Sequence, residues 1–331
     1  MRLSILDQSP VRKNSNAVEA LAETTRLARL AEALGYNRFW VSEHHNTTAL
    51  AGTSPEVLIA HLAAHTRHIR VGSGGVMLPH YSTLKVAEHF RLLEALYPGR
   101  IDLGMGRAPG GDRITAHILN PMNQFNPEDF IKQLFEIQHY LAGEPVPGDH
   151  NYKVYAMPEA PGVPEQWILS SSGESGIFAA HFGMHFAFAH FINPTGGPQA
   201  IRNYKETFRP SRQLKEPKAL VAIFVFCSED ELIIERNKAI TGYRFIQLER
   251  GKFEPVNYED TLDIDYTPAE MQRLQIHRKR VIIGTPAEVK DRMLRLANDY
   301  DCEEIMIANI ALDFEERIRS YELLADIFLK Y

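Results

Sequence analysis

Residues 69–79, IRVGSGGVMLP, and residues 100–111, RIDLGMGRAPGG, decide the fold of this chain, because in each a short apolar run ends in a glycine-rich turn. The runs LSILDQSP from Leu3 and RFWVSEHHN from Arg38 repeat the pattern with polar turns. Stretches of helical periodicity separate the four runs, so each unit is predicted to be a strand, a turn and a helix. Strands joined by helical crossovers run parallel. The pattern therefore predicts a parallel α/β barrel.

Four more apolar runs complete the predicted barrel. They begin at Trp167, His185, Ala219 and Glu303. With these runs the chain has the eight strands of a (β/α)8 TIM barrel, in which all strands open their carboxyl ends on one face. We therefore expect Gln8, His44, Gly74 and Arg107, which follow four different strands, to meet at that face.

One domain accounts for the whole chain. A barrel of this kind commonly takes about 250 residues or more, so we expect residues 1–331 to form a single domain. After the seventh predicted strand the periodicity breaks in a polar segment that contains Pro255 and Pro268. Long irregular segments in compact domains are often lids. We predict that residues 250–283 are an insertion after strand seven that covers the mouth of the barrel.

Composition narrows the class of protein. The formal net charge is −6, with 36 basic and 42 acidic residues and no basic block, which argues against nucleic-acid or anionic-lipid partners. Only Cys227 and Cys302 occur, outside any CxxC pair, so neither a disulfide scaffold nor a zinc site is indicated. Apolar runs are too short to cross a bilayer. We expect a cytoplasmic protein without a membrane role.

The sequence EHH at positions 43–45 ends the second predicted strand. Neighbouring residues of a strand point to opposite sides, so one histidine is expected to face the mouth while the other packs outward. Three roles remain open: a metal site completed by Asp7 and His190, a structural histidine, or an acid–base group. We favour the acid–base role.

The glycine-rich turn at 104–111 has the spacing G-x-G-x-x-P, with Pro109 where a dinucleotide fingerprint has its third glycine, and no helix is expected after it. The remaining interpretation is a flexible turn that presents Arg107 to an anion. Gly74 and Gly75 would let a flat ring lie against the main chain. The turn SSSGESG at 170–176 enters a helix and predicts a phosphate cradle, with Glu174 pointing away or capping the helix.

Taken together, these motifs resemble those of the bacterial luciferase-like, flavin-dependent oxidoreductases, and in particular the single-polypeptide subgroup. The resemblance covers nearly the full length of the chain. It rests on LDQSP (6–10), WVSEHH (40–45), VGSGGVMLPH (71–80), RIDLGMGRAPGGD (100–112) and SSSGESG (170–176).

The resemblance implies that FMN binds at the carboxyl ends of the strands. It implies a non-proline cis peptide near Gly74–Gly75 and places His44 beside the flavin as the catalytic residue. The expected cofactor-binding residues are Ser73, Gly74, Gly75, Arg107, Ala108, Pro109, Ser172, Gly173, Glu174 and Ser175. Gln8 and His190 are expected to contact the substrate.

The expected activity is that of a monooxygenase. Reduced FMN from a separate reductase would react with oxygen to give a peroxyflavin, which oxidises a small organic substrate. Luciferase has a reactive cysteine where this chain has Gly106, so light emission is not expected. A homodimer through helices near the second and third strands is implied. A deazaflavin-dependent hydride-transfer enzyme, a non-catalytic flavin-binding protein and a metal-dependent hydrolase stay open as alternatives.

Overall fold

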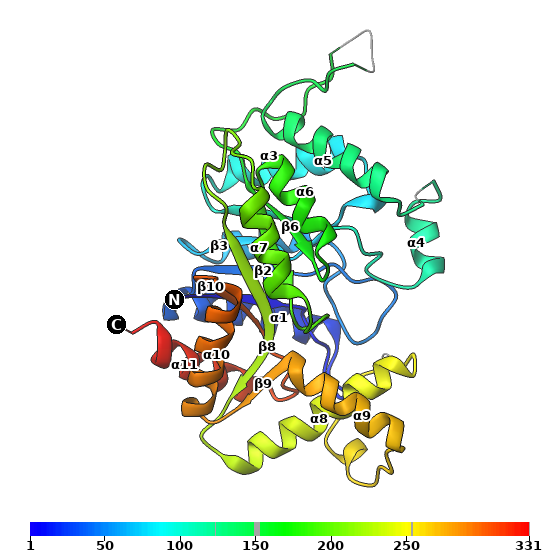
Figure 1. Cartoon of the computed structure of the whole chain (residues 1–331), viewed down its shortest axis with the longest axis vertical. Helices are drawn as coiled ribbons and strands as arrows, with labels where there is room; N and C mark the ends of the chain where they lie inside the picture. The colour runs from blue at the N-terminus through cyan, green and yellow to red at the C-terminus, as the bar shows by residue number, and fades with distance from the viewer. Residues whose placement is uncertain (123, 149–152, 253, 331) are drawn as a thin grey trace.

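The computed structural model describes residues 1–122, 124–148, 153–252 and 254–330. Eight parallel strands close into a barrel with helices around it, which confirms the predicted TIM barrel (Figure 1). In order around the barrel they are β1 (Arg2–Asp7), β2 (Arg38–Val41), β3 (Arg70–Ser73), β5 (Ile101–Gly106), β6 (Glu165–Ser170), β7 (His185–Ala189), β8 (Ala219–Cys227) and β10 (Glu304–Ala308). The pairings of β10 with both β8 and β1 close the ring.

Helices follow most of the barrel strands and begin and end where the sequence supplies caps. Those that cover the barrel are α1 (Ala17–Leu34), α2 (Pro55–Ala64), α3 (Thr83–Leu96), α5 (Pro127–Leu141), α6 (Glu174–Phe182), α7 (Gly197–Thr207), α10 (Pro286–Tyr300) and α11 (Phe314–Phe328). The side chain of Asn16 accepts a hydrogen bond from the main chain of Glu19 and starts α1, and Gly35 ends that helix with a φ of 83°. Local sequence thus fixes where the crossovers begin.

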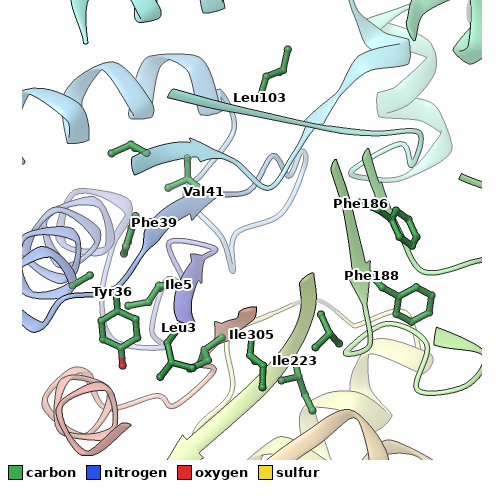
Figure 2. Packing of buried hydrophobic residues seen from close by; sticks show 14 of the residues in the cluster. Leu3, Ile5, Tyr36, Phe39, Val41, Leu103, Phe186, Phe188, Ile223 and Ile305 are labelled. Carbon is green, nitrogen blue, oxygen red and sulfur yellow. The ribbon is translucent and has the colours of Figure 1, made fainter. Parts of the chain in front are cut away.

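Two apolar layers lie on the two sides of the strands, because successive side chains of a strand alternate. The outer layer packs the strands against the helices and includes Ile5, Phe39 and Ile305 (Figure 2). The inner layer fills the barrel and includes Trp40, Trp167 and Met306. A packed interior leaves the mouth at the carboxyl ends as the place for a ligand.

The strand β8 is longer than its neighbours, and its two halves pair with different strands along one edge. Residues 219–222 pair with β7, while residues 224–227 pair with a further strand, β9 (Val281–Gly284). Phe224 is bonded to β9 on one side and to β10 on the other. The strand β10 pairs with one edge of β8. On the other edge β7 pairs with the first residues of β8, and β9 pairs with the last ones.

Residues 250–283 contain helices and the start of a strand, so the expectation that this segment is irregular was wrong. After α8 (Glu231–Glu249) come η2 (Glu259–Thr261), α9 (Pro268–His277), η3 (Arg278–Arg280) and β9. The lower part of Figure 1 shows α8 and α9 packed together at one side of the barrel. A capping box between Thr267 and Glu270 starts α9. Residue 253 of the expected lid lies outside the described residues.

The turn after β5 also departs from expectation. A helix, α4 (Arg113–Leu119), opens directly after it, with the Asp112 carboxylate accepting from the main chain of Ile114 and Thr115. Between β3 and α3 lie β4 (Val76–Met77) and η1 (Leu78–His80). Within the described ranges, none of the helices combines the length and apolar character that a membrane span requires.

Candidate active site

A cavity of about 860 Å³ opens at the carboxyl ends of the strands. Its floor is made by inner-layer side chains such as Leu6, Trp40 and Met306. The structure brings the following predicted residues together in its lining: Gln8, His44, Gly74, Gly75, Arg107, Ala108, Pro109, Ser172 and Ser175. Residues from five different strand ends therefore share one space, and its size suits a cofactor or a cofactor with a small substrate.

His44 is half-buried at the rim of this cavity. Burial lowers its pKa below the usual 6.5, the neighbouring charges of His45 and Arg244 lower it further, and a main-chain hydrogen bond with Gly110 and the charge of Glu43 act in the opposite direction. The side-chain amide nitrogen of Gln8 lies 3.2 Å from Nε2 of His44. An amide N–H donates to that nitrogen only when the ring is unprotonated there. The lowered pKa favours the neutral ring near pH 7, and in that form Nε2 can accept the hydrogen bond from Gln8 at the cavity.

Glu43 and His45 explain why the EHH motif holds His44 in place. Glu43 is completely buried, and its carboxylate accepts hydrogen bonds from His45 Nε2 at 2.8 Å, from the Tyr81 hydroxyl at 2.6 Å and from the Met77 main chain at 2.8 Å. The motif thus contains a buried carboxylate anchor, Glu43, one histidine bonded to that anchor, His45, and one histidine that lines the cavity beside Gln8, His44. His45 also borders a second cavity beside the first.

The peptide bond between Gly74 and Gly75 is cis, as the resemblance implied. Both glycines line the cavity, but packing inside the barrel also requires them. A Cβ on Gly74 would lie 2.7 Å from Leu6, and one on Gly75 would lie 2.3 Å from Leu169. The main chain here consequently forms part of the cavity wall without side chains in front of it.

Arg107 and the start of α6 supply hydrogen-bond donors on one side of the cavity. The Nη2 atom of Arg107 donates to Glu174 at 2.6 Å, whereas Nη1 is buried without a hydrogen-bond partner in the described part of the chain. Gly173 precedes α6 without a side-chain cap, and Ser172 and Ser175 line the cavity beside it. Uncapped N–H groups, hydroxyls and an arginine with a free N–H are the donors that a phosphate requires, so these residues fit the phosphate of a flavin nucleotide.

Four predicted residues lie outside the lining of this cavity. Ser73 is buried, and its hydroxyl exchanges hydrogen bonds with the main chain of Gly104. Gly173 does not face the space, and Glu174 binds Arg107 instead of pointing away or capping α6. These three residues act on the site through their neighbours.

His190 is the clearest departure from expectation. Its Nδ1 lies 2.7 Å from the Tyr300 hydroxyl and its Nε2 lies 2.8 Å from the Lys279 carbonyl oxygen, so both ring nitrogens already have hydrogen-bond partners within the protein. It lines neither of the two cavities at the mouth. A substrate contact through its side chain has no support in this arrangement.

The alternative metal site also lacks its ligands in this geometry. Asp7, which would have joined the histidines, accepts hydrogen bonds from Thr24 and Arg317. Among the described residues, no three histidine, cysteine or acidic side chains are grouped so as to hold a metal ion.

Two residues at the site, His80 and Arg244, were not predicted from the sequence. His80 Nε2 lies 2.8 Å from the Pro109 carbonyl oxygen and fixes the turn that carries Arg107. The histidine at the end of VGSGGVMLPH was a possible signal, but nothing in the sequence pairs it with Pro109. Arg244, on α8, lines the second cavity and reaches the neighbourhood of His44. A single arginine in a helical stretch carries no signal that separates it from a surface residue.

Comparison with known proteins agrees with this geometry. Residues 1–300 match the family of luciferase-like monooxygenases. The chain is 49% identical to the uncharacterized protein YwcH of Bacillus subtilis, with 98% of each chain covered. It is 37% identical to the N-acetyl-S-alkylcysteine monooxygenase of the same organism, over 99% of this chain and 98% of that protein. The crystal structure of apo-MsnO8 superposes with a TM-score of 0.90 and 35% identity, covering 99% and 98% of the two chains.

More distant structures share the fold alone. One is the oxygenating constituent of 3,6-diketocamphane monooxygenase from Pseudomonas putida in complex with FMN, with a TM-score of 0.72 and 18% identity over 98% of this chain and 96% of that one. Another is an F420-dependent secondary alcohol dehydrogenase, with a TM-score of 0.69 and 14% identity over 97% of both chains. The fold by itself therefore accommodates both flavin and deazaflavin cofactors.

Proposed function

Since the chain belongs to the family of luciferase-like monooxygenases, we propose that it is the oxygenase of a two-component system that uses reduced FMN and molecular oxygen to oxidise a small organic substrate. The observation that carries the proposal is the cavity that Arg107, with its unpartnered Nη1, the main chain of Gly74–Gly75 and His44 line together. It offers an anion site, a flat wall and a proton acceptor in one place.

FMN would be held by its phosphate and its ring. Arg107, Ser172 and Ser175 would bind the phosphate at the start of α6, and the main chain of Gly74 and Gly75 would lie against the ring. When bound, reduced FMN supplies the two electrons and the reactivity toward oxygen that the reaction needs. The apolar floor excludes water from this space, which favours transfer of oxygen to the substrate over release of hydrogen peroxide.

His44 moves a proton at Nε2. The low pKa that burial gives the ring leaves it unprotonated and able to accept a proton near pH 7. Gln8 holds the ring through the contact to Nε2, which makes Gln8 a positioning residue for that proton.

Supply of reduced FMN by a separate reductase is proposed by analogy with the oxygenating constituent from Pseudomonas putida. A homodimer is proposed through α2 and α3, which expose the apolar side chains of Val57, Leu92 and Leu96. Residues 250–283 are proposed as a lid, because residues 252 and 254–256 of that segment border the cavity beside His44.

The test combines binding with turnover. FMN, riboflavin and a deazaflavin are titrated anaerobically into the protein, and a flavin reductase with NADH then supplies reduced FMN in the presence of oxygen and N-acetyl-S-alkylcysteines or other small thioethers. We expect FMN to bind more tightly than riboflavin, and we expect oxidised product to form at the expense of peroxide. His44→Gln should lower the product per NADH consumed while FMN binding stays within about twofold.

Three outcomes would contradict the proposal. Tight deazaflavin binding without FMN binding would favour hydride transfer. Stoichiometric FMN binding without oxygen consumption would favour a non-catalytic flavin-binding protein. Unchanged product yield in His44→Gln would remove the histidine from the mechanism.

A further inference from the structure

A second cavity of about 970 Å³ lies against the first. The two cavities share five lining residues: Gln8, His44, Gly110, Phe191 and Ile192. His44 therefore stands at the junction of one continuous space. Apolar side chains from strand ends and from the insertion line most of the second cavity: Leu50, Phe224, Phe245, Val256, Ile310 and Ala311.

Arg244 of α8 brings a positive charge into this apolar surrounding. Its side chain lines the second cavity and, in the part of the chain that the structure describes, makes no hydrogen bond or ion pair. Burial alone lowers its pKa, with no acidic neighbour acting against it. A guanidinium nevertheless stays protonated in proteins. The cavity thus contains a permanent charge whose partner is missing from the described residues.

The other charged side chains that line this cavity either have a partner or contact, or lie exposed on its rim. Arg12 donates to Glu23 at 2.5 Å, and Glu249 accepts from Arg273 at 2.7 Å. Arg280 lies over the ring of Phe245 at 5.7 Å. Lys252 and Glu254 are exposed on the rim, and Glu254 is not bonded to Arg244. The buried Nε of Arg280 also lacks a hydrogen-bond partner among the described residues, but the charge of Glu249 acts on Arg280, whereas no acidic side chain acts on Arg244. Arg244 therefore differs from these groups in being desolvated in the cavity without a neighbouring opposite charge.

Arg244 lines the same cavity as His44, the proposed acid–base residue. The charge of Arg244 contributes, after burial, to the low pKa of His44. Leaving a desolvated charge without a partner costs free energy, and a bound anion would remove that cost. The anion site at Arg107 is on the other side of the space, because Arg244 does not line the first cavity.

We propose that the second cavity binds the organic substrate, and that Arg244 pairs with a monoanionic group, a carboxylate or a sulfonate, at one end of a mainly apolar molecule whose other end reaches His44. This inference rests on the proposed function, because it assigns the substrate class of the same oxygenase. The apolar lining would hold the body of the molecule, and the fork of the guanidinium would bind two oxygens of the anion.

The test measures binding to the flavin-free protein by calorimetry, so that it does not depend on turnover. The probes are acids and their neutral amides: hexanoate with hexanamide, 4-phenylbutanoate with 4-phenylbutanamide, and N-acetyl-S-butylcysteine with its carboxamide; hexanesulfonate is added. We expect at least one acid to bind about tenfold or more tightly than its amide. Arg244→Gln should abolish that preference, and Arg244→Lys should retain part of it.

Two controls accompany the variants. Lys238→Gln removes one positive charge from the same helix at an exposed position that lines a different cavity, and it should leave the preference unchanged. The melting temperature of Arg244→Gln should equal or exceed that of the wild type, because the substitution removes a desolvated charge without a partner. A preserved fold with a lost preference separates ligand binding from misfolding.

Equal affinity for every acid and its amide, no measurable binding of any acid at millimolar concentration, or an intact preference in Arg244→Gln would overturn the inference. Stronger binding of hexanesulfonate than of hexanoate would support it with a sulfonate as the anion. A preference that Glu254→Gln strengthens would support it with Glu254 as a competitor. FMN binding is measured separately, so a protein that prefers acids but binds no FMN refutes the proposed function and leaves the assignment of Arg244 standing.

Discussion

The Nη1 atom of Arg38, the first residue of β2, donates to the Oδ2 atom of Asp102 in β5 across 2.7 Å at the amino ends of the strands. Both side chains are almost fully buried. Arg38 also donates to Glu304 at 2.8 Å, and Asp102 accepts from Arg70 at 2.5 Å and from the Trp40 indole at 2.8 Å. This ion cluster closes the end of the barrel opposite the cavity, with charges that neutralise one another.

Asp102→Asn is expected to destabilise the protein by about 3 kcal/mol, because it leaves the buried Arg38 and the half-buried Arg70 with one negative charge fewer. Burial would raise the pKa of Asp102, but the charges of Arg38 and Arg70 hold it below its usual value. The carboxylate is therefore charged in the folded state. The free energy of unfolding in urea measures the effect.

The matched control is Glu144→Gln, which breaks the exposed pair with Arg212 at the surface. This substitution should change stability by less than about 1 kcal/mol. Equal losses in the two variants would show that the cluster at the strand starts contributes no more than a surface pair.

Substitution by alanine should lower stability strongly at Gly104 of β5 and hardly at all at Gly106 of the same strand. A Cβ at Gly104 would lie 2.1 Å from the Ser73 carbonyl oxygen, whereas a Cβ at Gly106 meets nothing closer than Met77 Sδ at 3.5 Å. Gly104→Ala should therefore cost about 3 kcal/mol of stability, and Gly106→Ala should stay within about 0.5 kcal/mol. Parallel urea unfolding of the two variants measures this, and comparable losses would contradict the packing argument.

Glu174→Gln is expected to tighten FMN binding by about fivefold, because the wild-type carboxylate binds Arg107 and would repel a phosphate beside it. Riboflavin, which lacks the phosphate, should bind both proteins equally. Fluorescence titration with the two flavins measures the difference. Weaker FMN binding in the variant would instead mean that Glu174 is needed to position Arg107.

Stability is expected to fall as the pH drops below about 6.5, the ordinary histidine value. Burial lowers the pKa of His190, although its main-chain hydrogen bond to Lys279 acts the other way. Between the lowered pKa and 6.5 the unfolded chain binds the proton and the folded chain does not, so acid favours unfolding. His190→Gln should reduce the slope of melting temperature against pH from 8 to 5, while exposed His68→Gln should not. Equal slopes in the wild type and His190→Gln would sink this explanation.

Much of the fold was predictable because its signals are local. Each of the eight barrel strands is an apolar run followed by a turn, and the parallel arrangement follows from the helices between them. The elements that were missed lack such signals. The helices α9 and α4 are short and pack little into the core: among the residues of α9 only His277 is buried, and among those of α4 only Ala116. β9 is four residues long and directly follows the basic residues 278–280.

The candidate site divides in the same way. Gln8, His44 and Arg107 were predicted to share one face, because each follows a strand of the same barrel, and they line one cavity. His190 also follows a strand, but the sequence contains no sign that Tyr300 and Lys279 would occupy both of its ring nitrogens. Pairings between residues about a hundred positions apart depend on the closed fold, and so does the free charge of Arg244.

Because β8 pairs with β7 and with β9 through different residues, the barrel and the segment that follows α8 can change independently. The first half of β8 is bonded within the barrel, and its second half carries β9 on an edge that β7 has already left. Lengthening, shortening or exchanging the chain between α8 and β9 consequently breaks no hydrogen bond of the eight-stranded ring. The sequence of that segment can therefore diverge between relatives while the hydrogen bonds of the barrel stay the same.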